Sequence, residues 1–366
     1  MADAGPIPIN LITGYLGSGK TTLLRHILSS ADFARSLVLI NEFGEIGLDH
    51  LLIGNVAANS VLFENGCICC SIRGDFRKAM LEALGANAGG YGRVFLEMTG
   101  LADPAPVIAA ITGDPVLRHH YRLGNIIATV DAVHWSDELD KDATVFRQIA
   151  VADRILLTKP DLVSEEAVTR SIAQIRQINP AATIAASTMG NVDTGILIGR
   201  DIYSPATKSA EAGSWFAPDL KRQSVGANGD SERKRRASFF AERVESHTEG
   251  IQSIAISIPD PIDWHAFGLW LTLMAHRHGE RILRIKGIVR LIDSDQPVVL
   301  HGVQSLLHPA EHLPEWPAGD RTSKIIMIVR GLNRAEIERS LNTFLSLKGG
   351  LSGADTEPQG TLRLGA

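Results

Sequence analysis

Residues 14–22 read Gly14-Tyr15-Leu16-Gly17-Ser18-Gly19-Lys20-Thr21-Thr22. This stretch matches G-x-x-x-x-G-K-[ST], the phosphate-binding loop, at every defined position. The apolar run 7–13 before it predicts a buried strand, and residues 21–30 after it predict a helix. Because the motif occurs in this strand–loop–helix context, the sequence predicts that the chain binds a nucleoside triphosphate.

The residues of this loop have separate expected roles. We expect its glycines to let the backbone wrap around a phosphate, so that successive amide groups point inward, next to the positive end of the helix dipole. We expect Lys20 to reach the β- and γ-phosphates and the Thr21 hydroxyl to ligate Mg²⁺. The predicted nucleotide-binding residues of the loop are Gly14, Gly17, Ser18, Gly19, Lys20, Thr21 and Thr22.

Length and charge limit the classes of protein to consider. The chain has 366 residues, enough for two domains, and a net charge of −5, which argues against general nucleic-acid binding. No apolar run has membrane-spanning length, and Met1-Ala2-Asp3-Ala4 lacks the basic region of a signal peptide. We therefore expect a cytoplasmic protein with no membrane and no nucleic-acid partner.

The sequence predicts two folded domains. Residues 1–200 alternate β-branched runs with helical patterns, which predicts an α/β P-loop NTPase domain with a mostly parallel sheet. Residues 201–249 are polar and charged and are interpreted as a mobile linker or insertion, whose basic part, 221–236, has no assigned role. Residues 250–348 predict a smaller α+β domain with helices on one face of an antiparallel sheet, and 349–366 a disordered tail. The expected strands are 7–13, 37–40, 94–97, 126–131, 155–158, 183–186, 251–258, 282–292, 298–306 and 324–330, and the expected helices include 21–30, 75–84, 144–152, 165–179, 263–276 and 334–347.

A strand that ends in an acid supplies the next part of the nucleotide site. It reads Arg93-Val94-Phe95-Leu96-Glu97-Met98-Thr99-Gly100. We expect Glu97 to hold Mg²⁺ through water or to orient the attacking water, and the Gly100 amide to contact the γ-phosphate. Lys20, Glu97 and Gly100 form the predicted catalytic set, and Thr21 and Glu97 the predicted magnesium set. An incidental glutamate at a strand end is the alternative interpretation.

The base-recognition element is expected at Leu156-Leu157-Thr158-Lys159-Pro160-Asp161. In GTP-binding proteins the corresponding N-K-x-D run uses its Asp to accept hydrogen bonds from guanine and its Lys to stack along the base. Lys159 and Asp161 match, whereas Thr158 stands where Asn is usual. A carboxylate favours guanine, because adenine presents no matching pair of donors. The sequence therefore predicts GTP, with Ser187 as a further candidate for base contact.

All three cysteines lie in Glu64-Asn65-Gly66-Cys67-Ile68-Cys69-Cys70. In a reducing compartment, cysteines are more often ligands or reactive groups than disulfides, and three thiolates suit a soft cation such as Zn²⁺. A closed structural zinc site takes a fourth protein ligand, and the chain has no fourth cysteine. The site is therefore completed by a carboxylate, a His or water, or it is open, which suits metal transfer. A redox pair and inert buried cysteines are the alternatives.

Asn41-Glu42-Phe43-Gly44 follows the second expected strand, where a nucleotide-sensing switch loop is expected. Glu42 is close in sequence to both sites and is a candidate ligand of Mg²⁺ or of the second metal; a solvent-facing loop glutamate is the alternative. The predicted metal set is Cys67, Cys69, Cys70 and Glu42.

Together these motifs resemble the CobW family of metal-handling GTPases, which are relatives of the GTPases that load nickel into urease and hydrogenase. Many members carry a His-rich stretch, which this sequence lacks, and its scattered histidines are interpreted as surface or packing residues. The resemblance implies a GTPase that binds Zn²⁺ or Co²⁺ at Cys67, Cys69 and Cys70 and delivers it to a client metalloprotein. The residues that carry it are 14–22, 41–44, 66–70, Lys159-Pro160-Asp161, Glu97-Met98-Thr99-Gly100-Leu101-Ala102-Asp103-Pro104 and, in the second domain, Lys286-Gly287 and His301-Gly302-Val303-Gln304.

The resulting hypothesis is a GTP-dependent metallochaperone with slow intrinsic hydrolysis, because no arginine finger is evident in cis. GTP and Mg²⁺ would order the Glu42 and Glu97–Gly100 loops, and hydrolysis would relax both and change the metal affinity of the thiolates. One alternative is a nucleotide-gated zinc sensor or buffer that does not transfer metal; another is a small-molecule kinase or ATPase with redox-active cysteines. The metal used, the client and the oligomeric state, with a homo-oligomer possible, stay open.

Overall fold

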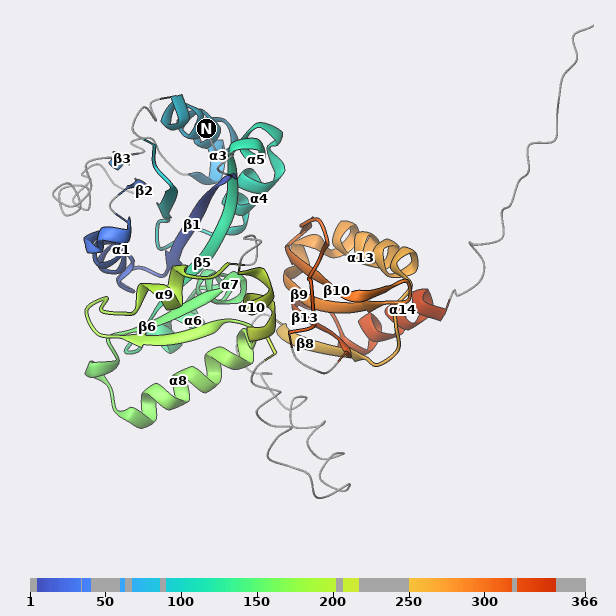
Figure 1. Cartoon of the computed structure of the whole chain (residues 1–366). Coiled ribbons are helices and arrows are strands. Elements are labelled where there is room, and N and C mark those ends of the chain that lie inside the picture. The colour runs from blue at the N-terminus through green and yellow to red at the C-terminus, as the bar shows by residue number, and fades with distance from the viewer. Residues whose placement is uncertain are drawn as a thin grey trace, which may run out of the picture.

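The computed structural model describes residues 5–33, 35–40, 60–62, 68–85, 90–201, 207–216, 250–317 and 321–346, with the backbone alone at 60–62, 68–75 and 140. These residues form an α/β domain followed by a smaller domain with an antiparallel sheet (Figure 1). In chain order the elements are β1 (Ile7–Gly14), α1 (Lys20–Ser29), η1 (Ala31–Phe33), β2 (Ser36–Ile40), β3 (Ser60–Leu62), α3 (Ile68–Gly85), β4 (Arg93–Glu97), α4 (Ala105–Gly113), α5 (Pro115–His120), β5 (Tyr121–Asp131), α6 (Trp135–Lys141), α7 (Ala143–Val151), β6 (Arg154–Thr158), η2 (Pro160–Leu162), α8 (Glu165–Ile178), β7 (Thr183–Ser187), α9 (Thr194–Ile198), α10 (Lys208–Ser214), β8 (Ile251–Ile258), α13 (Trp264–His278), η3 (Gly279–Arg281), β9 (Ile282–Leu291), β10 (Ser294–Val303), β11 (Leu306–Leu307), β12 (Glu311–His312), β13 (Ser323–Arg330) and α14 (Arg334–Ser346).

The described strands of the α/β domain form a seven-stranded sheet in the order β3-β2-β4-β1-β5-β6-β7, with every pair parallel. Helices cover both faces: α1 and α9 pack on one, and α3, α4 and α7 on the other. Because both faces are buried, the strands are continuous apolar runs, as parallel strands usually are. The parallel arrangement brings the carboxyl ends of all these strands to one edge. The predicted fold class of this domain is confirmed.

The smaller domain has a sheet in the order β11-β10-β9-β13-β8, in which neighbouring strands are antiparallel. One face packs on α13 and α14, so the predicted α+β arrangement is confirmed. The other face is also buried, because its apolar residues pack against the α/β domain and α10. Strand β9 shows this double burial directly: Ile285 points into the helix-covered core, whereas its neighbours Arg284 and Lys286 point toward the α/β domain.

Several elements differ from the sequence predictions. Helix α3 begins at Ile68, seven residues before its expected start, although Cys, Ile, Ser and Gly have modest helix propensity. Helix α4 was not expected, because two prolines, Pro104 and Pro106, stand at its start and its residues are apolar on all sides. Proline is tolerated in the first turn of a helix, where an amide has no intrahelical acceptor.

Part of the expected linker 201–249 is ordered in the structure. Residues Lys208–Ser214 form α10, in which Glu211 and Ala212 are buried, and Trp215 just after it is buried as well. Segments 202–206 and 217–249 lie outside the described residues, as does the expected tail 349–366. Among the described residues, no helix combines the length and the apolar character that crossing a membrane requires.

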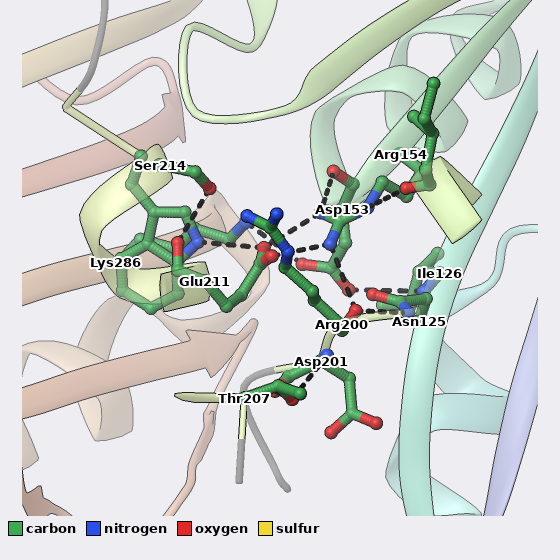
Figure 2. A network of polar contacts seen from close by, with 12 residues as sticks. Asn125, Ile126, Asp153, Arg154, Arg200, Asp201, Thr207, Glu211, Ser214 and Lys286 are labelled. Atoms are coloured by element: carbon green, nitrogen blue, oxygen red, sulfur yellow. Dashed lines mark hydrogen bonds and ion pairs between the residues drawn. The ribbon is translucent and has the colours of Figure 1, made fainter. Parts of the chain in front are cut away.

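A buried group of charged side chains joins β6, α10 and β9 (Figure 2). Asp153 forms ion pairs with Arg284 and with Lys286, whose Nζ atom lies 3.0 Å from the Asp153 Oδ1 atom. Arg154 forms two hydrogen bonds with the Glu211 carboxylate, of 2.8 and 2.5 Å. Each of these five residues is at most 4% exposed. We call these five residues the interdomain ion cluster.

Candidate functional site

The phosphate-binding loop connects β1 to α1 and depends on its glycines. Gly17 and Gly19 have φ of 70° and 95°, in the left-handed region that glycine adopts without steric cost. Gly14, with φ of 138°, lies so close to β5 that a Cβ atom would be 2.3 Å from the Thr129 Oγ1 atom. A side chain would therefore clash at Gly14, and at Gly17 and Gly19 it would strain the backbone.

Polar side chains hold the loop from within. The Lys20 Nζ group donates to the Tyr15 carbonyl oxygen at 2.9 Å, across the loop. The Ser18 hydroxyl donates to the same oxygen at 2.7 Å and lies 2.7 Å from the Thr129 Oγ1 atom. The Ser18 amide also donates to this oxygen, at 3.3 Å, so both donors of Ser18 are used inside the loop. Thr22, at the start of α1, is exposed.

Thr21 and Glu97 lie together at the carboxyl ends of β1 and β4. The Thr21 hydroxyl donates to the Glu97 Oε1 atom at 2.6 Å, although the two residues are 76 positions apart. Glu97 is 4% exposed, so its carboxylate is buried at the inner side of the site. A hydroxyl and a carboxylate are hard oxygen donors of the kind Mg²⁺ takes, usually beside phosphate oxygens and water. The predicted magnesium set therefore fits this ion.

The turn after β4 packs against the phosphate-binding loop. A Cβ atom on Gly100 would lie 2.6 Å from the Leu16 amide nitrogen, so only glycine fits there. The turn is also held from α7, because the Gln148 side-chain amide donates to the Gly100 and Ala102 carbonyl oxygens at 3.0 and 3.2 Å. Gln148 was not predicted from the sequence; the available signal is an amide side chain within the mostly apolar run 145–151 of α7.

The base-recognition element follows β6. Lys159, with φ of 54°, donates from Nζ to the Gly17 carbonyl oxygen at 2.9 Å and to the Asp131 Oδ2 atom at 2.7 Å. The Thr158 hydroxyl donates to the Ser18 carbonyl oxygen at 2.8 Å, so this departure from the usual Asn ties β6 to the phosphate-binding loop. Asp161 lies exposed in η2, whereas Ser187 is buried at the end of β7.

Asp131 is a second acid that the sequence analysis did not single out. It ends the apolar strand β5, as Glu97 ends β4, and this shared pattern is the signal that was available. Asp131 is 3% exposed and pairs with Lys159, whose side chain is 39% exposed. Nearby, burial and the Asp131 charge raise the pKa of Glu138. The edge near the base site is therefore acidic, with Lys159 as its counter-charge.

The predicted metal set lies mostly outside the described residues. Cys67 and Glu42 are not described, and Cys69 and Cys70 are described only as backbone in the first turn of α3. Within the described part of the chain, no three His, Cys, Asp or Glu side chains converge as a metal site. The position of the cysteines is known only through the topology: they follow β3 in the chain and precede the apolar part of α3.

Comparison with known proteins extends over nearly the whole chain. Residues 8–186 match the family model for the CobW/HypB/UreG nucleotide-binding domain, and residues 251–345 match that for the cobalamin synthesis protein CobW C-terminal domain. The zinc chaperone YjiA of Escherichia coli is 31% identical over 338 residues, covering 91% of this chain and 96% of YjiA. The zinc chaperone CobW of Pseudomonas aeruginosa is 28% identical over 380 residues, covering 94% and 93%.

A solved structure has the same arrangement. The crystal structure of the Zn(II)-bound YjiA GTPase from E. coli superposes with a TM-score of 0.65 at 25% identity, and the match covers 93% of this chain and 99% of that one. The phosphate-binding loop, the acid at the end of β4 and the turn on Gly100 agree with a nucleotide-hydrolysing domain of this kind. The chain belongs to the CobW family of P-loop GTPases.

Proposed function

We propose that this chain is a GTP-dependent zinc metallochaperone that binds the metal at Cys67, Cys69 and Cys70, with Glu42 as a further ligand, and delivers it to a client metalloprotein. Two relatives that span more than nine-tenths of the chain are named zinc chaperones, and another is named a zinc-regulated GTPase metalloprotein activator. Three thiolates without a fourth cysteine suit a site from which metal is passed on.

One observation carries the proposal: the segments for nucleotide and for metal leave the same edge of one sheet. In the order β3-β2-β4-β1, neighbouring strands are parallel, so their carboxyl ends meet at that edge. There β4 ends at Glu97 and β1 ends at the phosphate-binding loop. Strand β2 ends at Ile40, two residues before Glu42, and β3 ends at Leu62, five residues before Cys67.

The described contacts give the nucleotide a way to act on this edge. Thr21 bonds to Glu97 directly, and binding of Mg²⁺ by these oxygens would replace that hydrogen bond. Lys20 bonds to the Tyr15 carbonyl, and a β/γ-phosphate would compete for its donors. GTP and Mg²⁺ would therefore rearrange contacts between the phosphate-binding loop, the start of α1 and the end of β4, next to the strands that lead to Glu42 and the cysteines. Loss of the γ-phosphate would relax this arrangement.

A metal titration of the purified chain with GTP, GDP or no nucleotide tests the proposal. Co²⁺ is the probe, because thiolate ligation gives charge-transfer absorption, and competition then gives the affinity for Zn²⁺. We expect the affinity to differ at least tenfold between the GTP and GDP states, which is about 1.4 kcal/mol of coupling. By reciprocity, metal must change the ratio of GTP to GDP affinity by the same factor.

The control variant replaces Cys67, Cys69 and Cys70 by Ser together and should lose the charge-transfer absorption. This control matters because a YjiA triple mutant, with a glutamate and two cysteines replaced by alanine, is also described as Zn(II)-bound. Metal that persists in the serine variant belongs to another site. Equal affinity in every nucleotide state would contradict nucleotide-driven transfer and support the sensor or buffer instead.

A further inference from the structure

We propose that Gln148 is a positioning residue for GTP hydrolysis, which holds the Gly100–Ala102 turn against the phosphate-binding loop. The inference rests on the proposed role of Gly100 at the γ-phosphate. In this role Gln148 does not touch the nucleotide itself. It fixes the backbone turn whose Gly100 amide would contact the γ-phosphate. A positioning role of this kind is effective because displacement of a reacting group by about 1 Å costs roughly a hundredfold in rate.

The Gln148 side chain uses both of its donors on this turn. Its Nε2 group donates to the Gly100 carbonyl oxygen at 3.0 Å and to the Ala102 carbonyl oxygen at 3.2 Å. A primary amide has two N–H donors, so both are committed to residues two positions apart. Gln148 is 1% exposed, which removes water as a competing acceptor. The two hydrogen bonds therefore fix the peptide groups that follow Gly100 and Ala102.

The same turn is fixed on its other sides by independent contacts. The Met98 amide donates to the Ile12 carbonyl oxygen at 2.9 Å, which continues the sheet just before the turn. The Gly100 Cα packs so closely on Leu16 that a side chain at this position would clash. Arg147, next to Gln148, pairs with Asp103 at 3.2 Å. The Gly100 amide thus lies between a strand end, the phosphate-binding loop and α7, and Gln148 supplies the contact from α7.

Helix α7 also contacts the second domain. Its residues Ile149 and Ala150 belong to the hydrophobic cluster that includes Leu283 of β9 and Ile328 of β13, and α7 contacts β9 directly. Consecutive residues of one helix therefore face the catalytic turn and the C-terminal sheet. A shift of the C-terminal domain that moves α7 would move the Gly100–Ala102 turn with it, which gives a client a physical route to the hydrolysis rate.

A matched variant exists at the C-terminal cap of the neighbouring helix α8, where a second buried amide bonds to the end of α7. Asn179 is 1% exposed, and its Nδ2 group donates to the carbonyl oxygens of Ile149, Ala150 and Ala152. Like Gln148, it is a buried amide that donates to backbone carbonyl groups, but its acceptors belong to α7 and the residue after it and not to the Gly100–Ala102 turn. Gln148→Met and Asn179→Leu each remove such donors while keeping a side chain of similar shape, so both destabilise the fold by unpairing carbonyl groups.

The test is steady-state GTP hydrolysis with Mg²⁺, together with GDP affinity and urea unfolding, on the full chain. We expect Gln148→Met to lower kcat about 10- to 100-fold with GDP affinity within about twofold of wild type. Asn179→Leu should lose comparable stability and keep kcat within about twofold of wild type. This split between kcat and stability is the readout that a merely structural role does not produce.

Equal kcat values in the two variants would overturn the positioning role. If Gln148→Met does not fold, Gln148→Asn replaces it: the shorter amide keeps its donors but cannot span both carbonyls, and it should again lower kcat without weakening GDP binding. A wild-type chain that binds GDP but does not hydrolyse GTP would overturn the proposed function itself, and this inference with it.

Discussion

The two ends of β6 hold their polar groups in different ways. At its start, Asp153 and Arg154 belong to the interdomain ion cluster, in which every partner is a buried protein group. At its end, the Lys159 side chain is 39% exposed and bridges Gly17 and Asp131. The first end pairs its charges within the protein, whereas the contacts at the second can be exchanged for those of a nucleotide. One strand thus carries a permanent junction and an adaptable site.

The energetic consequences of the two ends also differ. Charges lose much of their hydration on burial, so a buried ion pair contributes little net stability when it is intact and costs several kcal/mol when one partner is removed. Burial opposes ionisation of Asp153, but Arg284, Lys286 and Arg154 more than offset it and lower the pKa of this carboxyl. The junction therefore fixes which surfaces meet, whereas the Lys159–Asp131 pair at the nucleotide end, with its lysine partly in solvent, contributes less to stability.

The largest predicted effect comes from breaking the junction at Asp153. In Asp153→Asn, the amide cannot accept from both Arg284 and the Ile126 amide with the correct polarity, and Arg284 and Lys286 lose their counter-charge. We expect a loss of about 3–5 kcal/mol in the free energy of unfolding, measured by urea denaturation.

The control for this prediction is a pair on the same domain boundary that is not buried. Lys208 of α10 bonds to Glu311 of β12 at 2.6 Å, but the Glu311 side chain is 52% exposed. Glu311→Gln should cost no more than about 1 kcal/mol. A similar loss in the two variants would mean that burial does not distinguish the junction.

The sequence predicted the nucleotide-site residues at the end of β6 but not the ion cluster at its start, and the reason is physical. Lys159 and Asp161 stand in a local motif whose spacing is set by one strand and one turn. The ion cluster instead joins Asp153 to Arg284, 131 positions away, so no local pattern contains both. The available signal was the pair Arg284 and Lys286 inside an otherwise apolar strand. It marks a buried charged face but does not identify the partner.

A second prediction concerns the pH dependence of stability beside the junction. His301 and His308 stack with centroids 4.2 Å apart, and burial followed by the Arg284 charge lowers the pKa of His308 to about 4. Burial, with His308 and Arg284, also lowers the pKa of His301. Between pH 6.5 and 4 the unfolded chain binds protons that the folded chain excludes, so stability must fall as the pH falls. We expect His308 to contribute about 2 kcal/mol of loss between pH 7.5 and 5.

The measurement is urea denaturation of wild type and His308→Gln at both pH values. Titration of the carboxylates is common to the two proteins, so the difference between their pH slopes reports His308 together with its effect on the pKa of His301. The variant should lose about 2 kcal/mol less than wild type over this range. Parallel slopes would contradict a neutral, partly buried His308, and with it the contrast between the junction and the more solvated nucleotide end.

The smallest predicted effect lies at the adaptable end, in Thr158→Val. This isosteric change removes the hydroxyl that donates to the Ser18 carbonyl oxygen at 2.8 Å. It keeps the Thr158 methyl group, which lies beside Gly19. Loss of one such hydrogen bond is worth about 1 kcal/mol, or roughly fivefold in affinity. Because the bond ties β6 to the loop that binds the phosphates common to both nucleotides, the affinities for GTP and GDP should fall equally.

The control is Thr158→Ser, which keeps the hydroxyl and should bind both nucleotides within about twofold of wild type. A change in the ratio of GTP to GDP affinity would show instead that Thr158 acts on the γ-phosphate side of the site, and that the end of β6 takes part in the switch.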